Sequence, residues 1–192
     1  MLSSIFAMML VAFPKSYTIP SVSMEPTFEA GDIFLVTVGG AYTPKRGDVV
    51  IFKVANKYSP DYMKDYVKRV IGLPGDHIQM IDSCLYLNGK IVPRVKVQDY
   101  VETVHGTAHH VDQFRETLPG GKSYLTLDRD RYGPLDNTGL YVVPAGYYFM
   151  IGDNRDNSKD SRDDGYVPAA DIVGPATTTI MSGGHFVWRP VD

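Results

Sequence analysis

The sequence predicts an all-β protein with an insertion or second subdomain and a short apolar segment at its start. Short runs of β-branched and aromatic residues alternate with Gly, Pro and Asn-Gly turn signals along most of the chain. No window keeps an apolar period of 3.6 residues beyond two or three turns, so long helices are not favoured. The 18 Gly, 13 Pro and 13 Tyr among 192 residues also favour strands and turns.

Eight strands are expected in chain order. Their ranges are 32–38, 48–54, 66–73, 77–81, 85–87, 90–92, 147–151 and 172–181. Asn88-Gly89 is a strong signal for a two-residue hairpin between two of them. Residues 94–140 are more polar and hold the charged run 128–131, so we expect an inserted subdomain there. The main β core would then consist of two parts, 17–93 and 141–192.

The first 16 residues are expected to form a membrane anchor. Residues 1–14 carry no charge, but their apolar stretch is shorter than the roughly 20 residues that a spanning helix needs. We interpret the segment as a natively short or truncated anchor, with Pro14 and Lys15 at the exit into the interface. A buried strand or helix and a cleaved signal peptide are the alternatives.

Charge and composition exclude several functions. The chain has 19 Lys and Arg against 22 Asp and Glu, with no basic block, so we expect no nucleic-acid partner. Cys84 is the one cysteine, which excludes an intramolecular disulfide and a thiolate zinc site. His105, His109 and His110 lack the Glu of a zinc-protease motif, and we expect neither a metal nor a cofactor.

Two serines stand two residues apart between Pro20 and Pro26. Proline restricts the residue before it to extended backbone, and in an extended segment Ser21 and Ser23 share one face. Two neighbouring hydroxyls suit a nucleophile and an oxyanion donor. Taken alone, however, serine near proline is usually only part of a turn.

A lysine in the third expected strand suits acid–base chemistry. Lys68 shares a face with Tyr66 and Val70, whereas Arg69 points the other way. Loss of hydration on an apolar face lowers the pKa of a lysine, and a neutral lysine can accept a proton from a serine hydroxyl. The alternative is a lysine that reaches solvent from an edge strand.

The run 152–165 is dense in Asp, Asn, Ser and Arg. It predicts a structured loop that is held by side-chain-to-backbone bonds and Asp–Arg pairs. Read as a calcium loop, it fails in both registers that we tested.

Four motifs in this order resemble those of the bacterial type I signal peptidases. They are IPSxSMxPT (19–27), RGDVVIF (46–52), DYVKRVIGLPGD (65–76) and GDNRDNSxDSR (152–162). The resemblance covers the chain from about 17 to 181 and implies two antiparallel β-sheet subdomains. It also implies a Ser/Lys dyad protease without a cofactor. Such an enzyme removes signal peptides from exported preproteins after small residues, at the outer face of the cytoplasmic membrane.

The resemblance assigns the reacting groups residue by residue. Ser23 matches the nucleophile, Lys68 the general base, and Ser21 the hydroxyl that assists the Ser23 N–H in the oxyanion hole. We expect Ser23 Oγ and Lys68 Nζ within about 3–3.5 Å of each other. Burial of Lys68 should lower its pKa. Val22 stands where the family often has Gly.

Supporting residues follow from the same resemblance. Ser158 matches the residue that hydrogen-bonds and orients the lysine, and Asp160 and Arg162 match a supporting ion pair. The positions that match the substrate pockets are Ile19, Met24, Tyr66 and Val67.

The expected partners are preprotein signal peptides and a phospholipid membrane. The catalytic domain would lie on the periplasmic side of the inner membrane, as a monomer. Phe186, Val187 and Trp188 are candidates for an apolar strip beside the active site, although an ordinary packed Trp is the alternative. Two other functions stay open: a relative that processes a single conjugation or pilus protein, and a non-catalytic β-domain that binds extended exported chains.

Overall fold

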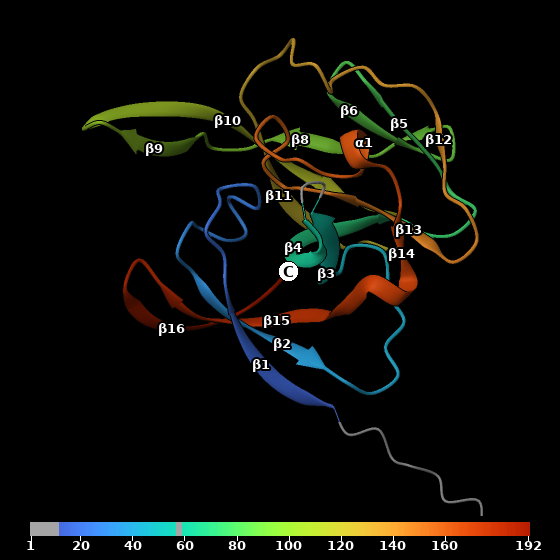
Figure 1. Ribbon diagram of the computed structural model, residues 1–192. Coiled ribbons are helices and arrows are strands. Elements are labelled where there is room, and N and C mark those ends of the chain that lie inside the picture. Colours follow the sequence, from blue (N-terminus) through green and yellow to red (C-terminus); the bar gives the residue numbers. More distant parts are fainter. Residues whose placement is uncertain (1–11, 57–58) are drawn as a thin grey trace, which may run out of the picture.

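The computed structural model describes residues 12–56 and 59–192, and strands dominate this part of the chain (Figure 1). Its helical residues are confined to α1 (Ser161–Asp164) and to one 3₁₀ turn (Ala169–Asp171). All pairings between the named strands are antiparallel, and the hairpin of β3 with β4 is one example. The predicted all-β antiparallel fold is therefore confirmed.

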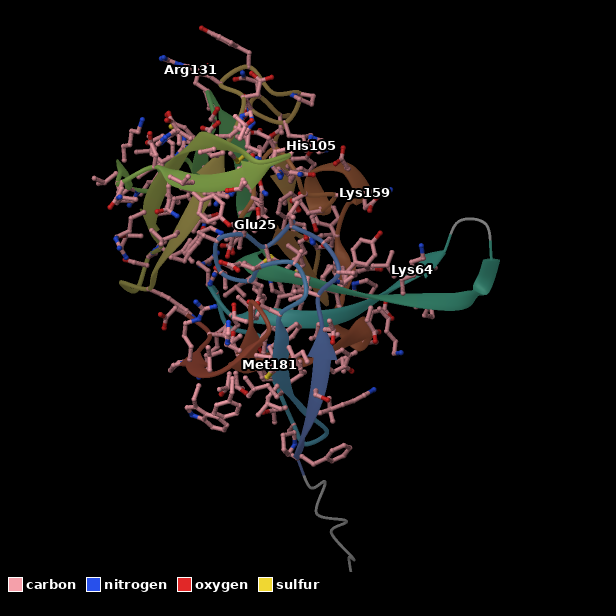
Figure 2. The ribbon with its side chains drawn as sticks, turned by 90° about the vertical axis from the view of Figure 1, so that its left-hand side faces the viewer. Glu25, Lys64, His105, Arg131, Lys159 and Met181 are labelled. Carbon is pink, nitrogen blue, oxygen red and sulfur yellow. The ribbon has the colours of Figure 1, made fainter. Side chains whose placement is uncertain are left out.

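The largest sheet has the strand order β1-β2-β15-β3-β4-β13-β14, with β16 paired to β15. Its strands are β1 (Phe13–Thr18), β2 (Ile33–Val38), β3 (Val49–Asn56), β4 (Ser59–Gly72), β13 (Tyr147–Ile151), β14 (Val167–Pro168), β15 (Ile172–Ser182) and β16 (His185–Pro190). The β3–β4 hairpin projects from the body of the molecule and carries Lys64 on its outer part (Figure 2). This sheet positions both halves of the site described below.

Two four-stranded sheets lie above the large sheet in Figure 1. One has the order β12-β5-β6-β7 and consists of β5 (His77–Ile81), β6 (Cys84–Leu87), β7 (Lys90–Ile91) and β12 (Tyr141–Val142). The other consists of β8 (Arg94–Lys96), β9 (Tyr100–Val104), β10 (Thr107–Thr117) and β11 (Ser123–Asp128). The predicted insertion 94–140 contains all of this second sheet, and its boundaries stay a prediction.

The hairpin signal Asn88-Gly89 connects β6 to β7. Both residues have positive φ, 52° and 75°, which matches the turn that closes two-residue hairpins. The sequence did not predict β1, which is exposed along nearly its whole length, or the long β9–β10 hairpin, whose outer residues are exposed on both faces. Such strands lack the alternation of buried and exposed residues by which strands are recognised.

The apolar start of the chain is described only in part. Residues 1–11 of the predicted anchor lie outside the described residues. Residues 13–16, the last of that segment, instead begin β1, because their backbone pairs with β2. Within residues 12–56 and 59–192, no helix has both the length and the apolar character needed to cross a bilayer.

A buried apolar cluster fixes the segment between β1 and β2. Met24, Phe28 and Phe34 are buried there, and the rings of Phe28 and Phe34 stack with centroids 4.4 Å apart. The Ile19 N–H donates to the Asp32 carbonyl at 3.1 Å, and the Gly31 N–H donates back to the Ile19 carbonyl at 2.7 Å. The segment that carries the two serines is therefore held at both ends.

Two buried ion pairs fasten the loop after β13 to the sheets. Arg69 of β4, fully buried, donates from Nε and Nη2 to the two Asp153 carboxylate oxygens at 2.8 and 2.7 Å. Arg155 forms a second two-pronged pair with Glu116 of β10, and Tyr124 of β11 donates to the same carboxylate at 2.8 Å. Such paired donors fix geometry as well as charge.

The Arg155–Glu116 pair predicts a large effect on stability. In Arg155→Met the Glu116 carboxylate stays buried without its cation. We expect the free energy of unfolding, measured by urea denaturation, to fall by about 3–5 kcal/mol. The double variant Arg155→Met with Glu116→Met removes both charges and should recover most of that loss. An equal loss in the single and double variants would contradict this account.

Candidate active site

Ser23 and Lys68 meet in the folded chain although 45 positions separate them. Lys68 Nζ donates to Ser23 Oγ at 2.7 Å, closer than the sequence led us to expect. Both residues are buried, with 7% of Ser23 and 4% of Lys68 exposed. A hydroxyl and an amine at this distance, shielded from water, are arranged for proton transfer.

Strand β4 brings Lys68 to the serine. Its side chains alternate, so Lys68 faces Ser23, whereas Arg69 points the other way, to Asp153 and Thr27. Lys68 stands opposite Val50 of β3. On its other edge, β4 pairs with β13 only from Arg69 onward. The residues of β4 before Arg69, including Lys68, therefore have no partner in β13. The lysine therefore sits where the sheet opens into a cleft.

The environment of Lys68 lowers its pKa to about 8. Burial is the main cause, because it penalises the charged ammonium. Asp160 and Asp153 oppose this effect through their charges, and Arg162 adds to it. Nζ also donates to the Val67 carbonyl at 2.9 Å. A large part of the lysine is therefore neutral near pH 8, as the sequence predicted.

Ser21 extends the line of polar groups. Its Oγ lies 3.2 Å from Ser23 Oγ, so a line of three polar atoms runs from Lys68 through Ser23 to Ser21, and all three residues line the cleft described below. Val22, between the serines, is not among the residues with positive φ in the described chain. The departure from Gly at this position therefore causes no backbone strain.

Asp160 and Arg162 form a buried ion pair beside the dyad. Arg162 Nε and Nη2 donate to the Asp160 carboxylate at 2.9 and 2.8 Å, and the Gly152 N–H donates at 2.9 Å. Burial opposes ionisation of Asp160, but the Arg162 charge and these hydrogen bonds outweigh it and lower the pKa. The carboxylate is thus fixed in its charged form near Lys68.

Ser158 lies close to the Ser23 backbone but does not make the expected hydrogen bond to Lys68. Its Oγ is buried and interacts instead with the Asp160 carboxylate, whose pKa it helps to lower. A Cβ on Gly152 would come within 2.1 Å of this Oγ and 2.6 Å of the Ser23 carbonyl oxygen. Only glycine allows Ser158 and the Ser23 backbone to approach this closely.

A cleft of about 580 Å³ opens beside the dyad. Ile19, Tyr66 and Val67 line it, as do both serines and Lys68. Met24 does not line this cleft; it is completely buried in the cluster with Phe28. Three of the four expected pocket residues therefore face the cleft, and Met24 lies beneath the serine segment.

Asn154 is a site residue that the sequence analysis missed. Its backbone N–H donates to the Ser23 carbonyl at 3.2 Å, and its Nδ2 donates to the Val22 carbonyl at 3.0 Å. Its place in the motif 152–162 was a signal, but its partners lie 132 positions away. In residues 12–56 and 59–192, no group of three or more His, Cys, Asp or Glu is arranged to hold a metal ion.

Comparison with known proteins identifies the family of this chain. A family model described as "Signal peptidase, peptidase S26" matches residues 1–181, so the chain belongs to this family. The signal peptidases I of Rickettsia typhi and Rickettsia canadensis are each 37% identical over 184 residues. The match covers 91% of this chain and 60% of each relative, so the chain spans about three fifths of their length.

A solved structure shows a weaker likeness. The crystal structure of a signal peptidase I from Enterococcus faecalis V583 is 26% identical, with a TM-score of 0.39. The match covers 71% of this chain and 98% of that one.

The lowered pKa of Lys68 predicts an unusual stability effect. Below pH 8 the folded protein buries a charged ammonium, a cost that the unfolded chain does not bear. At pH 6 we expect the free energy of unfolding of Lys68→Met to be about 3 kcal/mol higher than that of the wild type. Between pH 8 and 10.5 Lys68 is neutral in the folded protein but still protonated in the unfolded chain. The free energy of unfolding of the wild type therefore rises with pH in this range, and its difference from Lys68→Met disappears.

Urea denaturation at several pH values measures the difference. Lys53→Met is the matched control, because Lys53 is an exposed lysine on the neighbouring strand. A constant difference from pH 6 to pH 11 would contradict the burial account of Lys68.

Proposed function

We propose that this protein is a serine endopeptidase that cleaves signal peptides from exported preproteins with a Ser23/Lys68 dyad. The observation that carries the proposal is the 2.7 Å contact between Lys68 Nζ and Ser23 Oγ, made by a buried lysine whose pKa is about 8. Membership of the signal peptidase family supports the substrate class. A domain that only binds extended chains has no need of a neutral lysine against a serine hydroxyl.

The first step is acylation. Neutral Lys68 accepts the Ser23 proton while Oγ attacks the scissile carbonyl carbon. Negative charge develops on the former carbonyl oxygen, and we assign the Ser21 hydroxyl and the Ser23 N–H as the donors that stabilise it. The 3.2 Å contact between Ser21 Oγ and Ser23 Oγ supports this assignment. Lys68, now an ammonium, gives its proton to the leaving amine, and the acyl-enzyme forms.

The second step is deacylation. A water molecule replaces the leaving peptide, and Lys68 takes its proton as it attacks the ester carbonyl carbon. The bond to Ser23 Oγ then breaks, Lys68 returns the proton to Oγ, and the carboxyl product leaves. The ion pair of Asp160 with Arg162 lies close enough to act on the charge of Lys68, and Ser158 is buried in the same loop. We assign these three residues the role of holding Lys68 in its reactive position.

The cleft favours small side chains next to the scissile bond. Ile19 and Val67 are almost fully buried apolar residues at its wall, and Tyr66 is half-buried beside them. An apolar pocket of this kind selects by size, because a larger side chain meets atoms that cannot move apart. We therefore assign it cleavage after small residues, in sites of the Ala-x-Ala type.

We place the catalytic domain at the outer face of the cytoplasmic membrane. Signal peptides leave the bilayer there, so the dyad has to work close to that surface. Phe186 and Trp188 of β16 are 74% and 68% exposed, and they stand on the same face of the strand. Trp favours the interface between lipid and water. These two side chains are therefore suited to contact a lipid surface.

The dyad is tested by cleavage of a preprotein in detergent solution. We expect Ser23→Ala and Lys68→Met each to lower kcat by about 10³-fold or more, because each removes a reacting group. Lys53→Met should behave like the wild type. Cleavage by Ser23→Ala at the wild-type rate would exclude Ser23 as the nucleophile.

The pH dependence gives a separate test of the general base. Only neutral Lys68 can accept the serine proton, so kcat/KM should rise as the pH increases and level off above about 8. The rate is measured with one preprotein between pH 5 and pH 10. An optimum near pH 5 would indicate carboxylate chemistry instead.

The membrane contact can be followed by fluorescence, because Trp188 is the one Trp in the chain. Addition of phospholipid vesicles should shift its emission to shorter wavelength as the ring leaves water. Phe186→Asp should weaken the shift, whereas His185→Asp, one residue earlier on β16, should alter it less. An emission spectrum that vesicles do not change would contradict the assignment of β16 to the membrane surface.

A further inference from the structure

Arg129, just after β11, joins three separate segments of the chain. Its Nη1 and Nη2 donate to the two Glu102 carboxylate oxygens of β9 at 2.7 and 2.8 Å. Its Nε donates to Asn154 Oδ1 at 3.0 Å, and Nη2 also lies 3.3 Å from Glu25 Oε2. Figure 2 shows Glu25 beneath the hairpin that carries His105 at its turn. One guanidinium therefore links the inserted sheet, the loop after β13 and the serine segment.

The contact with Arg129 fixes which way the Asn154 amide points. A guanidinium can only donate, so the amide oxygen has to face Arg129, and the amide nitrogen faces the serine segment. There Nδ2 donates to the Val22 carbonyl at 3.0 Å, while the Asn154 backbone N–H donates to the Ser23 carbonyl at 3.2 Å. Asn154 thus holds the carbonyl groups on both sides of the nucleophile's Cα.

The same guanidinium balances a buried acid close to the nucleophile. Glu25 is two residues after Ser23 and 8% exposed. Burial raises the pKa of Glu25, and the charge of Arg129 opposes that rise. Glu102 in turn holds Arg129, which places the guanidinium between the two carboxylates. Loss of Arg129 would leave Glu25 buried without a cation and Asn154 free to turn over.

We propose that Arg129, held by Glu102 of the β9–β10 hairpin, is a positioning residue for Ser23 and acts through Asn154. The peptide groups around Ser23 set the direction of its Oγ towards Lys68 and of its N–H towards the oxyanion. A small displacement of either lowers the rate of acylation. The inferred role rests on the proposed function for its kinetic consequences. Under this proposal the sheet of β8 to β11 supports the reaction, although none of its residues is a reacting group.

The kinetic test uses Arg129→Gln, with Arg131→Gln as the matched control. Arg131 is exposed and makes no hydrogen bond or ion pair within the described residues. For Arg129→Gln we expect kcat of preprotein cleavage to fall about ten- to a hundredfold. KM should stay within about twofold, because the cleft walls are unchanged. The midpoint of the pH profile should not move, since Lys68 stays buried. Unchanged kcat in Arg129→Gln would overturn the proposal.

A double variant tests the route through Asn154. If Arg129 acts by orienting that amide, Arg129→Gln should cost little further rate in an Asn154→Ala background. Fully additive losses would show that Arg129 does not act through Asn154 and would overturn this part of the proposal. If Arg129→Gln folds poorly, Glu102→Gln is the second variant. Glu102 is partly exposed, and its replacement loosens the hold on the Arg129 guanidinium, so kcat should fall about threefold.

Hydrogen exchange separates this proposal from the proposed function, because it needs no substrate. In Arg129→Gln we expect peptides that cover residues 20–28 and 152–157 to exchange about tenfold faster than in the wild type. Arg131→Gln should exchange like the wild type. Faster exchange with no preprotein cleavage by the wild type would refute the protease and keep the positioning role. Normal cleavage with unchanged exchange would refute the positioning role alone.

Discussion

Strand β4 buries two consecutive cations on opposite faces, and the site depends on how each is compensated. Arg69 meets Asp153 in a two-pronged pair and keeps its charge at any pH that the protein meets. Lys68 forms no ion pair within the described chain, and burial lowers its pKa to about 8. The same strand therefore supplies one permanent cation for structure and one amine that can lose its proton.

The loop after β13 makes this asymmetry possible. Asp153 forms its ion pair with Arg69, and Asp160 accepts hydrogen bonds from Arg162 and from the Gly152 N–H. Both carboxylates lie near enough to raise the pKa of Lys68, yet neither forms an ion pair with it. Arg155 ties the loop to Glu116 in the second sheet. The charges of the loop are therefore paired with one another and with the sheets, and burial remains the largest influence on the pKa of Lys68.

The sheet of β8 to β11 is connected to Ser23 through a chain of polar contacts. Glu102 holds Arg129, Arg129 orients Asn154, and Asn154 binds the backbone on both sides of Ser23. An apolar contact could press the serine segment into place, but it would not fix the direction of two carbonyl groups. Hydrogen bonds do so because their strength depends on angle as well as distance.

The sequence by itself determined the all-β class, most strands with alternating burial, the Asn88-Gly89 turn and the meeting of Ser23 with Lys68. Each leaves a local record: a two-residue period, a turn dipeptide or a motif. The tertiary structure decided the exposed strands β1 and β9, the missing bond between Ser158 and Lys68 and the contacts of Asn154 and Arg129. Asn154 bonds to a group 132 positions away and Arg129 to one 104 positions away. Such partners are set by the path of the chain in space, and the spacing of residues along the sequence carries no trace of them.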